Sequence, residues 1–206
     1  MLNFEKPIYK ITDYVESNNF GKFELEPLER GFGTTLGNAL RRVMLSSMPG
    51  SSIVAVKIEG AMHEFQVLDG VVEDVTTIIL NLKNVVVKNH SDEDKIIHLS
   101  VSEERVVTAA DIETDSDVEV INKDQVIATL AKGGKLDMEM IVSNGRGYVP
   151  STENKKYTEN SKIGYIPIDA LYSPIERISY EVDNARVGQD ANYDKLIMNV
   201  QTNGSI

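Results

Sequence analysis

Residues 31–50 read GFGTTLGNALRRVMLSSMPG and predict one long helix. Thr34 or Thr35 can cap its start, because a hydroxyl oxygen accepts one of the backbone N–H groups that the first turn leaves free. Pro49 and Gly50 supply the stop, since neither continues a helix well. Apolar side chains recur between these ends at helical spacing and form one stripe: Phe32, Leu36, Leu40 and Val43.

The same helix carries apolar side chains beyond that stripe. Met44, Leu45 and Met48 lie well away from Val43 around the helix, so a single supporting sheet covers only part of the apolar surface. Two interpretations stay open: a second protein covers the remainder, or the helix lies between two layers of its own domain. Gly37 costs on the order of 1 kcal/mol relative to alanine inside a helix, which favours a close approach of another backbone there.

Residues 20–28, which precede the helix, alternate between apolar and charged side chains as a strand does. Phe23 and Leu25 point to one face, and charged side chains point to the other. Pro27 cannot donate a hydrogen bond to a neighbouring strand, so we expect this strand to lie at a sheet edge or to end there.

After the helix the pattern becomes mainly β. Short strands are predicted at residues 51–60, 94–102, 117–122, 125–131 and 135–145, the last with one apolar face made of Leu136, Met138, Met140 and Val142. One helix is predicted within residues 69–84, with a stripe of Val72, Val75, Ile79 and Leu82. Polar loops are predicted at residues 90–94 and 151–161, and further strands near residues 178–182 and 194–204.

These patterns predict an α+β fold. We expect a discontinuous α/β domain made of residues 1–49 and 175–206, with a mainly-β insert domain of residues 50–174 between its two parts. The 206-residue chain is long enough to bury a real core in such an arrangement.

Composition narrows the functional classes. The net charge is −11, which disfavours direct binding to the phosphate backbone of DNA. Cysteine is absent, so disulfides and thiolate sites are excluded, and a reducing compartment such as the cytoplasm is favoured. The start of the chain does not read as a targeting signal, and we expect no membrane span.

Motifs for catalysis or cofactor binding are not recognisable. The spacing Gly31-x-Gly33-x-x-x-Gly37 differs from a GxGxxG phosphate loop, and the three histidines are far apart. The acidic run at residues 111–119 lacks the glycine and glutamate of an EF-hand, so a solvated strand face or loop is the better interpretation. We therefore predict no catalytic, cofactor or metal residues. An enzyme using an acidic cluster with a metal, and a nucleic-acid-binding module, are the competing hypotheses.

Two adjacent arginines, Arg41 and Arg42, stand in the middle of the apolar helix. Neighbouring positions project about 100° apart, so the two side chains cannot serve one surface. We expect one of them to pair with an internal carboxylate and the other to face outward, where arginine is common at binding hot spots.

Residues 25–50 resemble the signature of the bacterial RNA polymerase alpha subunit family, and the resemblance continues in family order through residues 63–83, 107–122, 145–150, 168–189 and 193–204. It implies an N-terminal region that homodimerises and scaffolds assembly of the beta and beta-prime subunits, with omega and sigma joining in the holoenzyme. Nucleotidyl transfer would then belong to other subunits of a DNA-directed RNA polymerase.

The resemblance also implies roles for particular residues. It implies a dimer contact by Phe32, Leu36 and Val43, binding to the beta subunit by Arg42, Leu45 and Lys83, and binding to the beta-prime subunit by Arg186 and Lys195, within residues 168–175 and 180–200.

Two departures from the family pattern carry expectations. Family members continue into a long helix and a C-terminal DNA-binding domain where this sequence stops at Ile206, so a weaker dimer and no promoter-element binding are expected. Thr77 stands where some members carry an acid, so one contact with beta is expected to differ.

Overall fold

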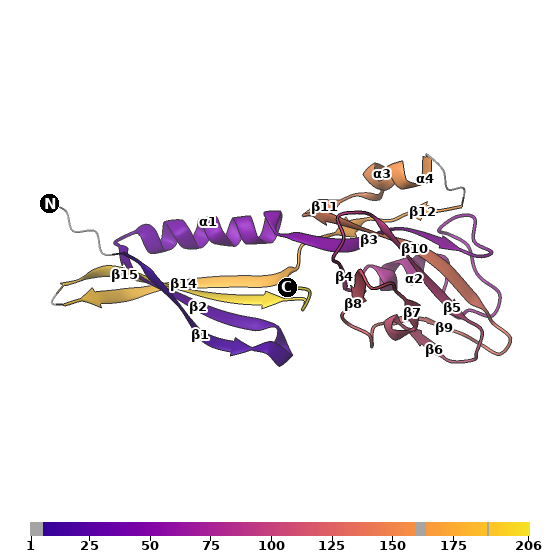
Figure 1. Cartoon of the computed structure of the whole chain (residues 1–206), viewed down its shortest axis with the longest axis horizontal. Helices are drawn as coiled ribbons and strands as arrows, with labels where there is room; N and C mark the ends of the chain where they lie inside the picture. The colour runs from indigo at the N-terminus through magenta and orange to yellow at the C-terminus, as the bar shows by residue number, and fades with distance from the viewer. Residues whose placement is uncertain (1–5, 160–163, 189) are drawn as a thin grey trace. The chain divides into compact units, whose positions relative to one another are not determined.

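A computed structural model describes residues 6–159, 164–188 and 190–206. The chain forms two compact units, coloured by residue number in Figure 1. The first unit combines the N-terminal part, up to Met48, with Ser173–Gly204 and Ile206, and the second unit comprises Pro49–Tyr172 and Ser205.

The first unit is built on an antiparallel sheet with the strand order β1-β2-β15-β14. Its strands are β1 (Ile8–Val15), β2 (Phe20–Glu29), β14 (Ile175–Val187) and β15 (Asp190–Thr202), and a short 3-10 turn, η1 (Glu16–Asn18), joins β1 to β2. β14 and β15 form the long hairpin that the alternation near residues 178–182 and 194–204 indicates. β1 was not predicted, although IYKITDYV is rich in β-branched and aromatic residues.

The expectation for Pro27 is wrong. β2 continues to Glu29 and lies inside the sheet, between β1 and β15. The β15 register jumps from Leu25↔Leu196 to Leu28↔Asp194, and Pro27 is paired in neither ladder. This irregularity is where the sheet tolerates a residue without an N–H donor.

Helix α1 (Phe32–Ser47) lies along one face of this sheet (Figure 1). The buried cluster beneath it consists of Leu28, Ile175, Ile178, Leu196, Met198 and Val200. Helix side chains packed against that cluster are partly buried: Leu36, Met44, Leu45 and Met48.

The predicted threonine cap of α1 is also wrong, because the cap comes from β15. Gly31 is the N-cap residue, with a φ of 89° that favours glycine. The Oδ2 atom of Asp194 accepts hydrogen bonds from the backbone N–H groups of Gly31 (2.8 Å) and Gly33 (3.1 Å). A carboxylate at a helix N-terminus accepts hydrogen bonds from backbone N–H groups that have no partner within the helix, and its negative charge interacts favourably with the helix dipole. Asp194 therefore fixes the start of α1 to the sheet.

A glycine is needed at position 37 because side chains of the sheet under α1 lie too close for a Cβ atom, and not because another backbone approaches. A Cβ atom at Gly37 would lie 2.5 Å from the Tyr180 ring and 2.9 Å from a methyl group of Leu196. Because both side chains belong to the sheet under α1, the close approach expected from the sequence is made by side chains inside the first unit.

The second unit contains an antiparallel sheet with the strand order β12-β3-β10-β5-β7. Its strands are β12 (Ile166–Pro167), β3 (Pro49–Ile58), β10 (Leu136–Arg146), β5 (Lys95–Val101) and β7 (Ile112–Glu113). Three two-stranded ladders accompany it: β11 (Tyr148–Val149) with β13 (Ala170–Leu171), β4 (Val87–Asn89) with β8 (Val118–Val120), and β6 (Val106–Thr108) with β9 (Val126–Thr129).

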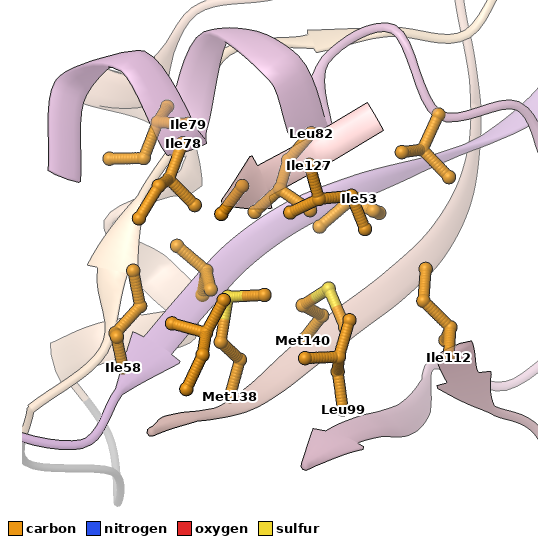
Figure 2. Packing of buried hydrophobic residues seen from close by; sticks show 14 of the residues in the cluster. Ile53, Ile58, Ile78, Ile79, Leu82, Leu99, Ile112, Ile127, Met138 and Met140 are labelled. Atoms are coloured by element: carbon orange, nitrogen blue, oxygen red, sulfur yellow. The ribbon is translucent and has the colours of Figure 1, made fainter. Parts of the chain in front are cut away.

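Helix α2 (Val75–Leu82) contributes its buried side chains to the hydrophobic core of this unit. Figure 2 shows Ile78, Ile79 and Leu82 directed toward Met138 and Met140 of β10. The predicted apolar face of β10 is confirmed, since Leu136, Met138, Met140 and Val142 are all at most 3% exposed. Val72 lies before the helix and is 69% exposed, so its placement in the helical stripe is wrong.

The segment at residues 151–161 differs from the predicted loop. It contains the short helices α3 (Ser151–Asn154) and α4 (Lys156–Glu159), and residues 160–161 lie outside the described part. A further 3-10 turn, η2 (Ala109–Asp111), precedes β7. The α+β class is confirmed, with a second unit that is mainly β. Within the described ranges, no helix is long and apolar enough to cross a membrane.

Candidate interaction surfaces

Helix α1 exposes an apolar stripe on the flank that the sheet leaves uncovered. Phe32 is 52% exposed, Leu40 39% and Val43 56%. Leu36, which the sequence groups with them, is partly buried against the sheet. The predicted dimer residues therefore divide: Phe32 and Val43 face solvent, whereas Leu36 packs within the first unit.

An apolar groove of about 260 Å³ borders this stripe. Its walls come from α1, β1, β2 and β15, and nearly all of the lining side chains are apolar: Tyr9, Phe23, Glu24, Leu25, Leu40, Met44, Leu196, Met198 and Val200. β1 adds exposed apolar side chains beside it, including Tyr9 and Ile11 at 75% and 58% exposed. Stripe and groove form one apolar surface of the kind that marks a binding site.

Arg42 and Leu45 lie on another side of α1. Their positions are about 60° apart around the helix, and Arg42 is about 100° from Val43. Arg42 is exposed, and no ion pair is found for it among the described residues. Leu45 is partly buried against the cluster under the helix. Arg42 is thus a cation available to a partner.

Arg41 behaves differently from its neighbour. Its Nε atom donates a hydrogen bond to the backbone oxygen of Ile178 on β14, at 3.4 Å. One arginine is therefore tied to the sheet of its own unit, as expected, although its acceptor is a backbone carbonyl and not a carboxylate.

Lys83 belongs to the second unit and follows the last turn of α2. Its Nζ atom lies 2.7 Å from Oδ2 of Asp169, and the two side chains are 32% and 30% exposed. Hydrogen bonding from Lys83, and then from the Ser151 backbone N–H, holds the pKa of Asp169 below its usual value. The ammonium group predicted to bind beta is thus already engaged inside the unit.

Thr77 is exposed on the first turn of α2. Its backbone N–H donates to Oδ1 of Asp74, the N-cap residue, at 2.7 Å. The hydroxyl-bearing side chain at this position offers a neutral surface where an acid would offer a charge.

Arg186 and Lys195 both lie on the β14–β15 hairpin, but in different environments. Arg186 is exposed near the hairpin end, and its Nε atom donates to the backbone oxygen of Gly188 at 3.0 Å. Lys195 forms an ion pair with Glu24 of β2 at 2.5 Å, and their side chains are 23% and 13% exposed. The hydrogen bond that Lys195 donates to the Glu24 carboxylate lowers the pKa of Glu24 and raises the pKa of Lys195, so this lysine is committed to its own sheet.

Sequence reasoning missed an exposed apolar loop between β3 and α2. Met62, Phe65, Val67 and Val72 are between 69% and 89% exposed. Gln66 holds the loop, because its Oε1 accepts from the Met62 N–H (2.9 Å) and its Nε2 donates to the Gly60 oxygen (2.6 Å). The available signal was a run of apolar residues, AMHEFQVLDGVV, that follows neither a helical nor a strand period.

The acidic run at residues 111–119 is partly neutralised by cations of the same unit. Arg105 donates to both carboxylate oxygens of Asp111 at 2.8 Å, and Lys95 approaches Asp117 at 2.5 Å. Among the residues that the structure describes, no group of three or more His, Cys, Asp or Glu side chains is arranged to hold a metal ion. The run is built as ion pairs on the surface of the second unit.

Comparison with known proteins follows the division into units. The family model described as "RNA polymerase Rpb3/RpoA insert domain" matches residues 56–173. Curated relatives named "DNA-directed RNA polymerase subunit alpha" include those of Symbiobacterium thermophilum and Oceanobacillus iheyensis, each 54% identical over 206 residues, and that of Moorella thermoacetica, also 54% identical.

All three relatives match 100% of this chain, and the chain spans 65%, 65% and 64% of their respective lengths. The family model covers more than half of the chain, and the relatives match it from end to end at high identity. The chain therefore belongs to the RNA polymerase alpha subunit family, and residues 56–173 are its insert domain.

Proposed function

We propose that this chain is the assembly region of the alpha subunit of a bacterial DNA-directed RNA polymerase, acting as a homodimeric scaffold for the beta and beta-prime subunits. The observation that carries this proposal, beside family membership, is that α1 has two separate exposed surfaces, one apolar and one centred on a free arginine. Two surfaces on one helix allow pairing and capture at the same time.

The apolar surface is assigned to a second copy of the chain. Phe32 and Val43 are more than half exposed, and the groove beside them is almost wholly apolar. Burial of apolar area contributes about 25 cal/mol per Å², so pairing of two such surfaces around a two-fold axis is favourable. Leu36 supports this contact from beneath, by fixing α1 on the sheet.

The surface around Arg42 is assigned to the beta subunit. An exposed guanidinium with five donors suits carboxylates or carbonyl groups of a partner, and Leu45 next to it offers an apolar edge. A role of Lys83, which belongs to the second unit, in binding the same subunit is part of the proposal as well. Beta-prime is assigned to the β14–β15 hairpin, where Arg186 is the more accessible of the two predicted cations because Lys195 is paired with Glu24.

The proposed complex is a nucleotidyltransferase to which this chain contributes no catalytic residue. Omega and sigma complete the proposed holoenzyme. The net charge of −11 supports a role in protein assembly over direct contact with DNA. Within the described residues, Arg105 pairs with Asp111 and Lys95 pairs with Asp115 and Asp117, which weakens the support for a metal-dependent enzyme.

The test is the solution mass of the purified chain, alone and mixed with its cognate beta subunit, by light scattering on a sizing column. We expect a dimer that binds beta. A monomer that still binds beta would contradict the pairing surface and leave capture standing, whereas a chain that never binds beta would overturn the assembly proposal.

The Arg42→Ala variant makes the assignment residue-specific. Loss of the guanidinium should weaken beta binding on the order of tenfold or more, as for an arginine hot spot, with the dimer mass unchanged. Thr35→Ala, an exposed change two turns earlier on the same helix, is the matched control and should bind beta normally. Equal beta affinity for Arg42→Ala and the control would remove Arg42 from the interface.

A further inference from the structure

We infer that Lys83 is a positioning residue: it acts on partner capture through Asp169, by holding the segment around β13 in place, and not through its own contact with the partner. This inference rests on the proposed function for its binding readout. Its structural half concerns the chain alone.

The geometry around Lys83 leaves little of its ammonium group for a partner. Its Nζ lies 2.7 Å from Oδ2 of Asp169, at a separation of 86 residues in the sequence. The stem of Lys83 is anchored as well, because its backbone N–H donates to the Ile79 oxygen at 3.1 Å in the last turn of α2. The lysine therefore connects a helix with a buried core face to a distant surface segment.

Asp169 is the point at which three segments meet. Its Oδ1 accepts from the backbone N–H of Ser151, the first residue of α3, at 2.8 Å, while its Oδ2 binds Lys83. On the preceding residue, the Ile168 N–H donates to the Val54 oxygen of β3, and the Ile168 oxygen accepts from Nδ2 of Asn154, at 3.0 Å and 2.8 Å. One carboxylate thus ties the end of α2 and the start of α3 to the link between β12 and β13.

The segment held in this way presents an exposed apolar pair. Leu171 of β13 lies directly opposite Tyr148 of β11, and the two are 63% and 61% exposed. Opposed residues of an antiparallel pair project from the same face, so their position depends on the same short ladder. With only two residues in each strand, β11 and β13 have few backbone hydrogen bonds of their own, and the side-chain ties at Asp169 matter correspondingly more.

The chemistry separates positioning from direct contact. If Lys83 touched the partner, its charge would be needed where it stands, and reversing the pair would destroy binding. If Lys83 acts through Asp169, an ion pair of either polarity can restore the tie between α2 and residue 169, and the two residues should be energetically coupled.

The experiment is a double-mutant cycle on the full chain, with beta binding measured by titration calorimetry. Lys83→Ala and Asp169→Ala should each weaken binding on the order of tenfold, and the double variant should be no weaker than either single one. The charge-exchanged chain, Lys83→Asp with Asp169→Lys, should recover part of the affinity, because it restores the tie to α2 but offers no acceptor to the Ser151 N–H. A loss confined to Lys83→Ala, or a charge-exchanged chain as weak as the single variants, would overturn the inference.

A second measurement needs no partner. Amide hydrogen exchange at residues 168–171 should be faster in Lys83→Ala and return toward the original rate in the charge-exchanged chain. Ser151 should exchange fast in the charge-exchanged chain, because a lysine at 169 cannot accept its N–H. Lys88→Ala, a change at another partly exposed lysine of this unit, is the control and should leave these rates unaltered. Unchanged exchange rates in Lys83→Ala would overturn the inference even if this variant binds beta. Failure of the unaltered chain to bind beta would instead overturn the proposed function.

Discussion

The two units differ in how far they bury the apolar side chains around their main helix. In Pro49–Tyr172, residues such as Ile78, Leu99 and Met140 are at most 1% exposed, between a helix and a sheet of the same unit (Figure 2). In the unit that holds α1, side chains as large as Tyr9 and Phe32 remain 75% and 52% exposed. The helix of the second unit packs on a closed core, although the loop before that helix is exposed, whereas the helix and the first strand of the other unit leave apolar side chains open to solvent.

This contrast explains why the proposed interface residues gather on α1. A helix lying on one face of a sheet has a flank that the sheet does not cover, whereas α2 buries Val75, Ile78, Ile79 and Leu82 in a closed core and leaves Leu80 exposed. Four sets of substitutions test this difference between the two units, and their expected effects decrease from the first to the fourth.

The first change compares the two cores. Leu99→Ala should lower the free energy of unfolding of the second unit by about 2–5 kcal/mol, because it leaves a cavity in a closed core. Leu36→Ala, at a partly buried site in the first unit, should cost about 1 kcal/mol. Urea unfolding, followed by hydrogen exchange in each unit, measures both. Equal losses would mean that the first unit is as closed as the second.

The second change tests the apolar stripe. Phe32→Glu combined with Val43→Glu should weaken self-association on the order of a hundredfold, since pairing would bury charges without partners. Sedimentation velocity measures the shift toward monomer. Asn38→Glu, exposed and about 140° from Val43 around the helix, supplies the charge-matched control. An unaltered sedimentation profile for the double variant would count against the dimer surface.

The third change asks why α1 contains Gly37. Alanine should gain about 1 kcal/mol from helix propensity, but its Cβ would lie 2.5 Å from the Tyr180 ring. We expect overpacking to win, with a net loss of about 1–2 kcal/mol in thermal or urea unfolding. The exposed neighbour Asn38→Ala reports propensity alone. Should Gly37→Ala stabilise the chain yet abolish the dimer, the glycine would serve a partner after all.

The fourth change concerns surface charge in the second unit. Hydrogen bonding to Arg105 holds the pKa of Asp111 below its ordinary value, so its contribution to stability is present above about pH 4 and is lost as pH falls through the lower folded pKa. Asp111→Asn should therefore differ from the original chain at neutral pH and converge with it in acid. Acid titration of unfolding measures this, and a constant difference at every pH would rule out the ion pair as its cause.

Much of the local structure was predictable because periodicity reports it directly. The helix within residues 31–50 and the buried face of β10 follow from side-chain spacing. β1 was missed because the first residues were considered only as a targeting signal. Val72 was misplaced because a helical spacing continued past the residue at which Asp74 starts the helix.

The sequence indicated which residues are candidates but not the environment of each one. Resemblance pointed to Arg42, Lys83 and Lys195, and all three are lysines or arginines that sequence alone treats as equivalent exposed cations. The structure leaves Arg42 exposed, pairs Lys83 with Asp169 and pairs Lys195 with Glu24. Each difference depends on a carboxylate that lies far away in the sequence.

The pattern of residues therefore determined most of the longer elements, the α+β class and the family, because helix and strand periods and contiguous motifs involve neighbouring residues. Tertiary structure alone decided that Asp194 caps α1, that Pro27 fits inside a sheet, that Gly37 meets Tyr180, and which flank of α1 stays apolar and open. Capping, steric contact and ion pairing act over a few ångströms in space, whereas the residues that they join here lie more than eighty positions apart in the chain.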